Sequence, residues 1–250
     1  MELIREDVIR RLVVALDTSD AEGILALARR LVGQVGMFKI GLEAFTAAGP
    51  GLVDRVQEVG LPVFLDLKLH DIPNTVERAA ANCARLGVAL FNVHAAGGPD
   101  MVRAAAAGAD AGTPAGKSRP RLLAVTVLTS LDEAVLERLG MPGTAQQRVV
   151  EWAAMSREAG ADGVVCSPKE LAALRQHLGP QFVLLAPGIR PAGSAAGDQK
   201  RIATPVSALA DGADFIVVGR PITGAPDPAA AAAAIVDEVV GPAASGGSAR

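Results

Sequence analysis

Eight short runs rich in Val, Ile, Leu and Phe recur along the chain, and they constrain its fold more than any other feature. The runs are Leu12–Leu16, Gly36–Ile40, Val63–Leu67, Ala89–Val93, Leu122–Leu128, Gly163–Cys166, Val183–Ala186 and Phe215–Val218. They are nearly continuously apolar rather than alternating, which is typical of strands buried on both faces of a parallel sheet. The first run begins at residue 12 and the last at residue 215, so successive runs start about 29 residues apart.

Stretches rich in Ala, Leu and Arg, with helical spacing, separate these runs. Ala21–Leu31 follows three good N-cap residues, whereas Thr75–Leu86 and Gln146–Ala159 each stop at a glycine. Strand–helix alternation repeated eight times predicts an α/β protein with a single (β/α)₈ TIM barrel over residues 1–240. A doubly wound open sheet is the alternative architecture.

Three segments are predicted to lie outside the regular elements. Gly108–Pro120 and Ala192–Lys200 have the composition of loops, and Gly241–Arg250, rich in Gly, Ser and Ala, is expected to be a disordered tail.

Composition excludes several classes of function. The chain has 24 Lys+Arg against 27 Asp+Glu, a formal charge of −3, and only 3% aromatic residues, so we expect no nucleic-acid partner. No apolar run is long enough to span a bilayer, and Met1–Arg10 lacks the apolar region of a secretory signal. Cys83 and Cys166 are far apart and lack metal-ligand spacing, so we interpret them as buried thiols and expect a cytoplasmic protein.

Polar side chains gather where the predicted strands end. Because all strand ends of such a barrel converge on one face, residues from separate segments would meet at one site. The residues are Asp17, Lys39, Asp66, Lys68, Asp71, Thr129, Arg190 and Arg220, with the backbone N–H of Gly219 beside Arg220.

The densest of these segments is Phe64–Thr75. Asp66 and Lys68 are two residues apart, so along a strand they share one face. Buried charges are costly unless paired, and with Asp71 and Lys39 they could form an alternating network. A purely structural network at the barrel rim is the alternative interpretation.

A second cluster combines Gly188 and Arg190 with Gly219 and Arg220. Loops after the seventh and eighth strands of this fold often bind phosphate, and arginine suits bidentate phosphate contacts. By contrast, His70 and His94 are interpreted as structural polar residues at the rim, because no metal-binding histidine motif accompanies them. Neither a dinucleotide fingerprint nor a P-loop motif is present, and we expect no metal and no cofactor.

Taken together, these segments resemble the orotidine 5′-phosphate decarboxylase family over about residues 11 to 240. The block from Asp66 to Thr75 is the most specific piece, since its His-Asp-Ile-Pro-Asn-Thr continuation resembles the bacterial branch. The other matching pieces are Val14–Asp17, Phe38–Gly41, Asn92–His94, Val125–Ser130, Ala186–Arg190, Gly197–Gln199 and Val217–Arg220.

The resemblance implies a carboxy-lyase that converts orotidine 5′-phosphate to UMP and CO₂, the last step of pyrimidine nucleotide synthesis, without a cofactor. Lys68 would protonate C6 of the pyrimidine, and Asp66 would lie beside the departing carboxylate. Lys39 would join the charge network and reach the ribose. Asp71 and Thr75 would extend into the neighbouring subunit's site, which implies a homodimer.

The remaining site residues would bind the nucleotide, again by resemblance. Asp17 would bind a ribose hydroxyl, Thr129 would touch the pyrimidine edge, and Gln199 would bridge base and phosphate from a mobile loop. The residues that would hold phosphate or line the site are Pro187, Arg190, Gly219 and Arg220.

Two other functions stay open. Metal-dependent sugar-phosphate decarboxylases or aldolases share the Asp-x-Lys-x-x-Asp block, but they use an acidic residue in the second strand where this chain has Lys39, which would repel a metal. A non-enzymatic nucleotide-binding or scaffold protein would use the charge network only for structure.

Overall fold

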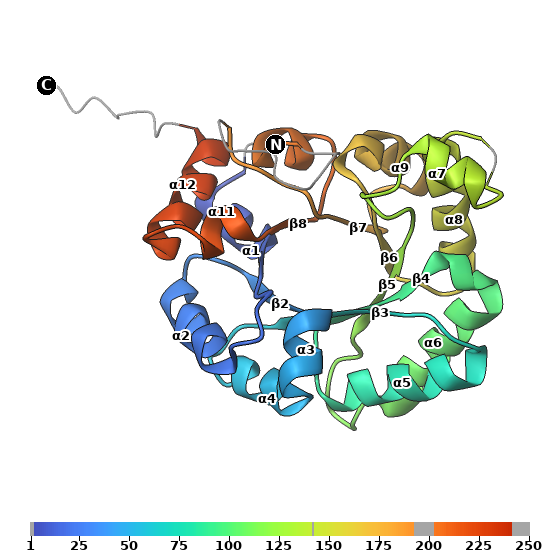
Figure 1. The fold of residues 1–250 in the computed structure, drawn as a ribbon, viewed down its shortest axis with the longest axis horizontal. Helices are drawn as coiled ribbons and strands as arrows, with labels where there is room; N and C mark the ends of the chain where they lie inside the picture. The colour runs from blue at the N-terminus through green and yellow to red at the C-terminus, as the bar shows by residue number, and fades with distance from the viewer. Residues whose placement is uncertain (1–2, 142, 193–202, 242–250) are drawn as a thin grey trace, which may run out of the picture.

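The computed structural model describes residues 3–141, 143–192 and 203–241. Its centre is a closed barrel in which eight parallel strands follow one another in chain order and β8 pairs with β1 (Figure 1). The strands are β1 Leu12–Ala15, β2 Met37–Gly41, β3 Val63–Leu69, β4 Leu90–His94, β5 Arg121–Val125, β6 Gly163–Val165, β7 Val183–Ala186 and β8 Phe215–Val218. The predicted TIM barrel is therefore confirmed, and the open-sheet alternative is wrong.

The helices form a ring around the strands (Figure 1). The α-helices are α1 Arg5–Arg11, α2 Ala21–Leu31, α3 Leu42–Ala48, α4 Gly51–Gln57, α5 Pro73–Arg85, α6 Gly98–Gly112, α7 Glu133–Arg138, α8 Ala145–Glu158, α9 Leu171–Leu178, α10 Pro205–Ala210, α11 Arg220–Thr223 and α12 Pro228–Val240. Two short 3₁₀ helices are η1 Ala95–Gly97 and η2 Pro168–Glu170.

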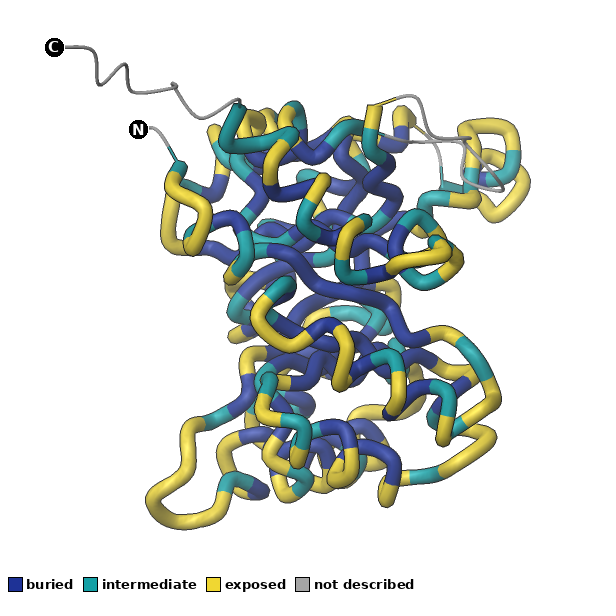
Figure 2. The backbone as a smooth tube through the Cα atoms, turned by 90° about the vertical axis from the view of Figure 1, so that its left-hand side faces the viewer, coloured by how far each residue is buried: buried dark blue, intermediate teal, exposed yellow. Residues whose placement is uncertain are grey.

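Each strand buries both of its faces. Outward residues such as Val14 and Phe38 pack with the helices in the larger apolar cluster. Inward residues fill the barrel interior and form a separate cluster, which consists of Val13, Ala15, Met37, Phe64, Leu90, Leu123, Val183, Leu185 and Val217. Burial on both faces explains the continuous apolar runs, and Figure 2 shows the buried tube running through the middle of the molecule.

The ends predicted from the sequence for most helices and strands lie within one or two residues of the observed ends. The predicted β7 and β8 and the helix Ala21–Leu31 have the bounds given above. β3 and β5 differ by more than one residue at an end: β3 continues past Leu67 to Leu69, and β5 stops at Val125 rather than at Leu128.

The prediction of a loop from Gly108 was wrong, because Gly108–Gly112 forms the last turn of α6. Glycine often marks a loop, but here it permits close helix packing. A Cβ added to Gly108 would lie 2.1 Å from the carbonyl oxygen of Glu77, and one added to Gly112 would lie 2.2 Å from that of Ala81. The backbones of α5 and α6 therefore approach each other directly at these glycines.

Some expectations lie at the limits of the described residues. Most of Ala192–Lys200 and all of the tail after Gly241 fall outside them.

Cys83 and Cys166 are both buried free thiols, and burial raises the pKa of each, that of Cys83 to about 11. Within the described ranges, no helix has the length and apolar character needed to cross a membrane.

Candidate active site

The alternation of the strands brings the predicted charged residues into the barrel mouth. Ala15, Met37 and Phe64 point into the barrel interior. Asp17, Lys39 and Asp66 each come two residues after one of these, so they continue the inward-facing rows toward the carboxyl ends of the strands.

These side chains form a chain of alternating charge. The Lys39 ammonium lies 2.8 Å from Oδ1 of Asp17 and 3.3 Å from Oδ2 of Asp66. The Lys68 ammonium lies 2.6 Å from Oδ1 of Asp66. The predicted network is present within one subunit, but its second carboxylate is Asp17 rather than Asp71.

Asp66 is the centre of this network. It is buried, as is Lys39, whereas Lys68 is half-buried and Asp17 is exposed. Burial alone would raise the pKa of Asp66, but attraction to Lys39 and Lys68, with hydrogen bonds from Lys68 and Asn92, lowers that pKa below its usual 3.8. Asp66 therefore holds its negative charge between the two ammonium groups at neutral pH.

Lys68 has a left-handed backbone, with φ of 53°. Along β3 and β4 the pairing goes from Leu65 opposite Phe91 to Leu69 opposite Val93, so β3 carries two extra residues and bulges. A non-glycine residue in this conformation costs about 1–3 kcal/mol and persists only where its surroundings enforce it. Such strain is common at functional sites.

Gly41 makes room for the ion pair between Asp17 and Lys39. A Cβ at this position would lie 2.7 Å from Oδ1 of Asp17 and 2.9 Å from the Lys39 nitrogen. Because both contacts are shorter than real Cβ atoms show, any side chain here would displace the two charges.

Two adjoining cavities open beside this network. The larger, about 490 Å³, is mostly polar and is lined by Ala15, Asp17, Lys39, Gly41, Leu42, Glu43, Asp66, Lys68, Pro187, Gly188, Arg190, Val217, Gly219, Arg220 and Thr223. The smaller, about 160 Å³, is mostly apolar and is lined by Lys39, Phe64, Asp66, Lys68, Val125, Val127, Leu128, Thr129, Val165, Cys166, Leu185, Pro187 and Val217. Lys68 and Pro187 line both, so one ligand with a polar and an apolar part could occupy them together.

Arg190 and Arg220 bring positive charge to the larger cavity. Gly188, with φ of 80°, turns the chain after β7, and the backbone N–H of Arg190 donates to the carbonyl of Ala203. Burial and repulsion from the Arg220 guanidinium both lower the pKa of Arg190. Two guanidinium groups close enough to repel each other suit a dianionic group between them.

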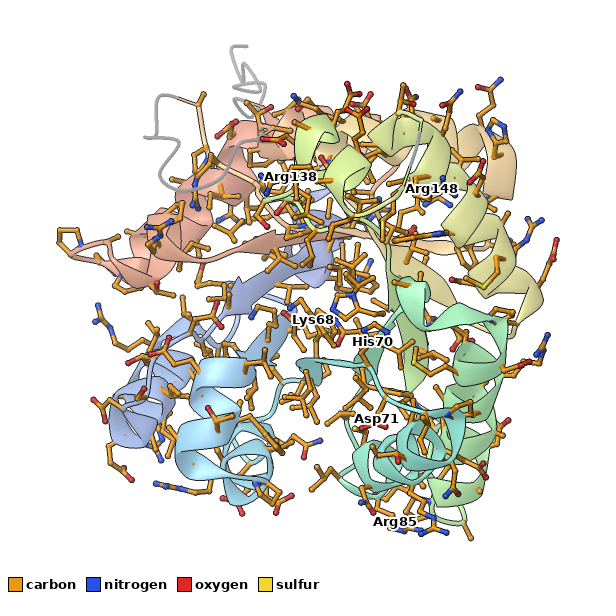
Figure 3. All side chains as sticks on the ribbon, turned by 45° about the vertical axis from the view of Figure 1, so that its right-hand side comes forward. Lys68, His70, Asp71, Arg85, Arg138 and Arg148 are labelled. Carbon is orange, nitrogen blue, oxygen red and sulfur yellow. The ribbon has the colours of Figure 1, made fainter. Side chains whose placement is uncertain are left out.

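Asp71 and Thr75 do not join this cluster. Both are exposed, and Oδ1 of Asp71 accepts a hydrogen bond from the backbone N–H of Ile72. In Figure 3, Lys68 lies at the middle of the barrel with His70 beside it, whereas Asp71 lies farther out, toward α5. Ile72 next to it is 66% exposed, so this corner presents polar and apolar groups outward from its own barrel.

His70 and His94 lie at the rim, where the sequence analysis placed them. The rings of His70 and His94 are 5.4 Å apart. Burial, together with the nearby His70 and Lys68, lowers the pKa of His94. The residues described include no cluster of His, Cys, Asp or Glu suited to a metal ion.

Two further points complete the account of the predicted residues. Gln199 lies outside the described residues, and its predicted role is therefore not visible here. Asn92 was missed as a site residue: it is only 1% exposed and donates to Oδ1 of Asp66 at 2.7 Å. A polar residue inside an otherwise apolar strand was the available signal.

The chain is similar to known proteins over most of its length. Residues 10–235 match the model of the family described as "Orotidine 5′-phosphate decarboxylase / HUMPS family". The chain is 52% identical over 240 residues to the orotidine 5′-phosphate decarboxylase of Moorella thermoacetica, with 95% of each chain covered. It is 54% identical over 225 residues to that of Anaeromyxobacter dehalogenans, covering 90% of this chain and 96% of the relative.

Solved structures show the same likeness. The crystal structure of orotidine 5′-phosphate decarboxylase from Lactobacillus acidophilus superimposes with a TM-score of 0.82 at 42% identity, covering 92% of this chain and 99% of the other. A structure of an uncharacterized conserved protein from Geobacillus kaustophilus gives a TM-score of 0.80 at 41% identity, covering 91% and 99%.

Proposed function

The chain belongs to the orotidine 5′-phosphate decarboxylase / HUMPS family, and we propose that it decarboxylates orotidine 5′-phosphate to UMP and CO₂. The observation that carries this proposal is the Lys39–Asp66–Lys68 network, which borders both an apolar cavity and a cavity holding two arginines. The pyrimidine ring fits the chemistry of the first cavity, and the ribose phosphate fits that of the second.

The reaction places its main demand on Lys68. When the bond from C6 to the carboxylate breaks, CO₂ leaves and the electron pair stays on C6. An ammonium fixed beside C6 stabilises this charge electrostatically, and it then delivers its proton to C6 to form UMP. Lys68 recovers a proton from solvent. Asp66, 2.6 Å from the Lys68 ammonium, orients the donor and lies beside the departing carboxylate.

Lys39 and Asp17 extend the network toward the ribose hydroxyls, and Thr129 faces the pyrimidine edge. Arg190, Gly219 and Arg220 hold the phosphate, with Pro187 lining the junction of the two cavities. Gln199 would bridge base and phosphate. Binding energy from the phosphate, which does not react, can be used to position and desolvate the pyrimidine.

The active form is proposed to be a homodimer in the cytoplasm. Asp71 and Thr75 are exposed on their own barrel, and Ile72 between them is 66% exposed. In such a dimer, Asp71 and Thr75 would reach across the interface into the neighbouring subunit's site, and Ile72 would be covered.

The test is the loss of orotidine 5′-phosphate absorbance in buffer containing EDTA, with UMP and CO₂ measured as products. We expect equal molar amounts of both, at the same rate with and without the chelator. Absence of turnover would overturn the proposal. Activity that EDTA removes and divalent metal restores would instead favour a metal-dependent sugar-phosphate decarboxylase or aldolase. The ion pair between Lys39 and Asp66 is evidence against that alternative, because it places a cation where the metal would bind.

A further inference from the structure

Asn92 is a buried amide at the centre of the proposed site. It is the third residue of β4, between Phe91 and Val93, which both pack outward in the larger apolar cluster. Leu90 belongs to the interior cluster, so Asn92, two residues later, points into the barrel. Its exposure of 1% means that both polar atoms of its amide need partners.

Both atoms have partners in the catalytic network. The Asn92 side-chain N–H donates to Oδ1 of Asp66 at 2.7 Å, and its carbonyl accepts from the backbone N–H of Lys68 at 2.7 Å. The reversed amide would put an oxygen against the carboxylate and an N–H against an N–H, so these two contacts fix its orientation.

The second contact lies at the bulge of β3. Lys68, with φ of 53°, lies between Leu65 and Leu69, where two extra residues interrupt the pairing of β3 with β4. Its N–H is bonded instead by the Asn92 carbonyl. One side chain on the neighbouring strand therefore holds both the strained backbone that aims Lys68 and the carboxylate that pairs with its ammonium.

We propose that Asn92 is a positioning residue for the decarboxylation, acting through Asp66 and Lys68 rather than on the substrate. This inference rests on the function proposed above. Without Asn92, Lys68 loses the hydrogen bond at its bulged backbone and Asp66 loses one of its hydrogen-bond donors. The ammonium then no longer has a single fixed position beside C6, so kcat falls while nucleotide binding is kept.

The pH profile gives a readout that a merely structural role would not change. The charged groups facing Asp66 are Lys39 from β2, Lys68 from β3 and, farther away, His94 from β4; Asp17 from beyond β1 reaches it through Lys39. Removing the Asn92 donor takes away one stabiliser of the Asp66 carboxylate. The acid limb of kcat in the variant should therefore move to higher pH.

The experiment compares wild type, Asn92→Ala, Asn92→Asp and Thr113→Val. Thr113 is the control: its hydroxyl donates a part-buried hydrogen bond to the carbonyl of Ala109 at the C-terminal end of α6, and it lines neither cavity of the site. Measurements are kcat and KM for orotidine 5′-phosphate, Kd for UMP, and kcat against pH. Asn92→Asp keeps the volume and an acceptor for the Lys68 N–H but replaces the donor to Asp66 with an oxygen.

For Asn92→Ala we expect kcat to fall about 100-fold, as for a misplacement of about 1 Å, with Kd for UMP within about threefold of wild type. Asn92→Asp should lose at least as much near neutral pH, and Thr113→Val should keep wild-type kcat. If Asn92→Ala does not fold, the isosteric Asn92→Asp decides the matter. A folded Asn92 variant with wild-type kcat and pH profile would overturn the inference, whereas an inactive wild type would overturn the proposed function instead.

Discussion

Gly41→Ala tests whether the exact position of the Lys39 ammonium matters. The new Cβ would start 2.7 Å from Oδ1 of Asp17 and 2.9 Å from the Lys39 nitrogen, against an ordinary contact of 3.4 Å or more. The carboxylate must retreat by about 0.7 Å and the ammonium by about 0.5 Å for these contacts to become ordinary. Both atoms are at the ends of flexible side chains, so the fold can adjust but the network cannot keep its geometry.

Little loss of stability should accompany this change. Gly41 has φ of −95°, which alanine adopts without strain, and replacing glycine at such a position stabilises by about 0.4–1 kcal/mol through the unfolded chain. That gain offsets part of the cost of the displaced ion pair, and we expect the free energy of unfolding to change by less than about 1 kcal/mol. Displacements of this size should lower kcat about 10- to 100-fold.

The assay is decarboxylation kinetics together with urea unfolding for wild type, Gly41→Ala and Gly51→Ala. Gly51 is the matched control: it begins α4, and a Cβ there would meet nothing within 4 Å. Gly51→Ala should keep wild-type kcat. Wild-type kcat in Gly41→Ala would refute the reasoning, because the added methyl group cannot coexist with the present positions of Asp17 and Lys39.

Three further predictions concern the dimer, the charge network and the helix packing. Inactive Asp71→Ala and Lys68→Ala subunits, mixed and allowed to exchange, should recover about a quarter of wild-type activity. Half of the dimers are then mixed, and each mixed dimer has one intact site out of two. No recovery after verified exchange contradicts a shared site. The pKa of Asp66 in the folded protein lies below its ordinary 3.8, so its ionised form stabilises the fold above that pH and loses this effect as the pH falls through the lower folded value. The difference in unfolding free energy between wild type and Asp66→Asn should therefore shrink below about pH 4. A difference that stays constant with pH contradicts this prediction. Gly108→Ala should destabilise by about 1–3 kcal/mol, seen as a lower Tm, because its Cβ would meet the Glu77 backbone oxygen at 2.1 Å; an unchanged Tm contradicts the close packing of α5 and α6.

The barrel could be predicted because its physics is local and repeated. Burial on both strand faces leaves an apolar run in the sequence, and the period-two alternation then places Asp66 and Lys68 on one face. The convergence of strand ends supplied the rest of the cluster, including Lys39 and Arg190. None of this required knowledge of the contacts themselves.

Other features could not be predicted, since they depend on contacts between distant segments. The left-handed backbone of Lys68 has no local signature, because it is held by Asn92 from the next strand. Likewise, Gly108 looks like a loop residue until the approach of α5 explains why glycine is needed there. The choice of Asp17 as the second carboxylate depends on the reach of Lys39, which spacing does not fix.

The most direct test of the central claim is Lys68→Ala, because this claim assigns charge stabilisation and proton delivery to one ammonium group. Turnover of orotidine 5′-phosphate and binding of UMP are measured on the same folded preparation. We predict that turnover is abolished while UMP binding stays measurable through Arg190 and Arg220, the residues proposed to hold the phosphate. Near-normal turnover in Lys68→Ala would contradict the account.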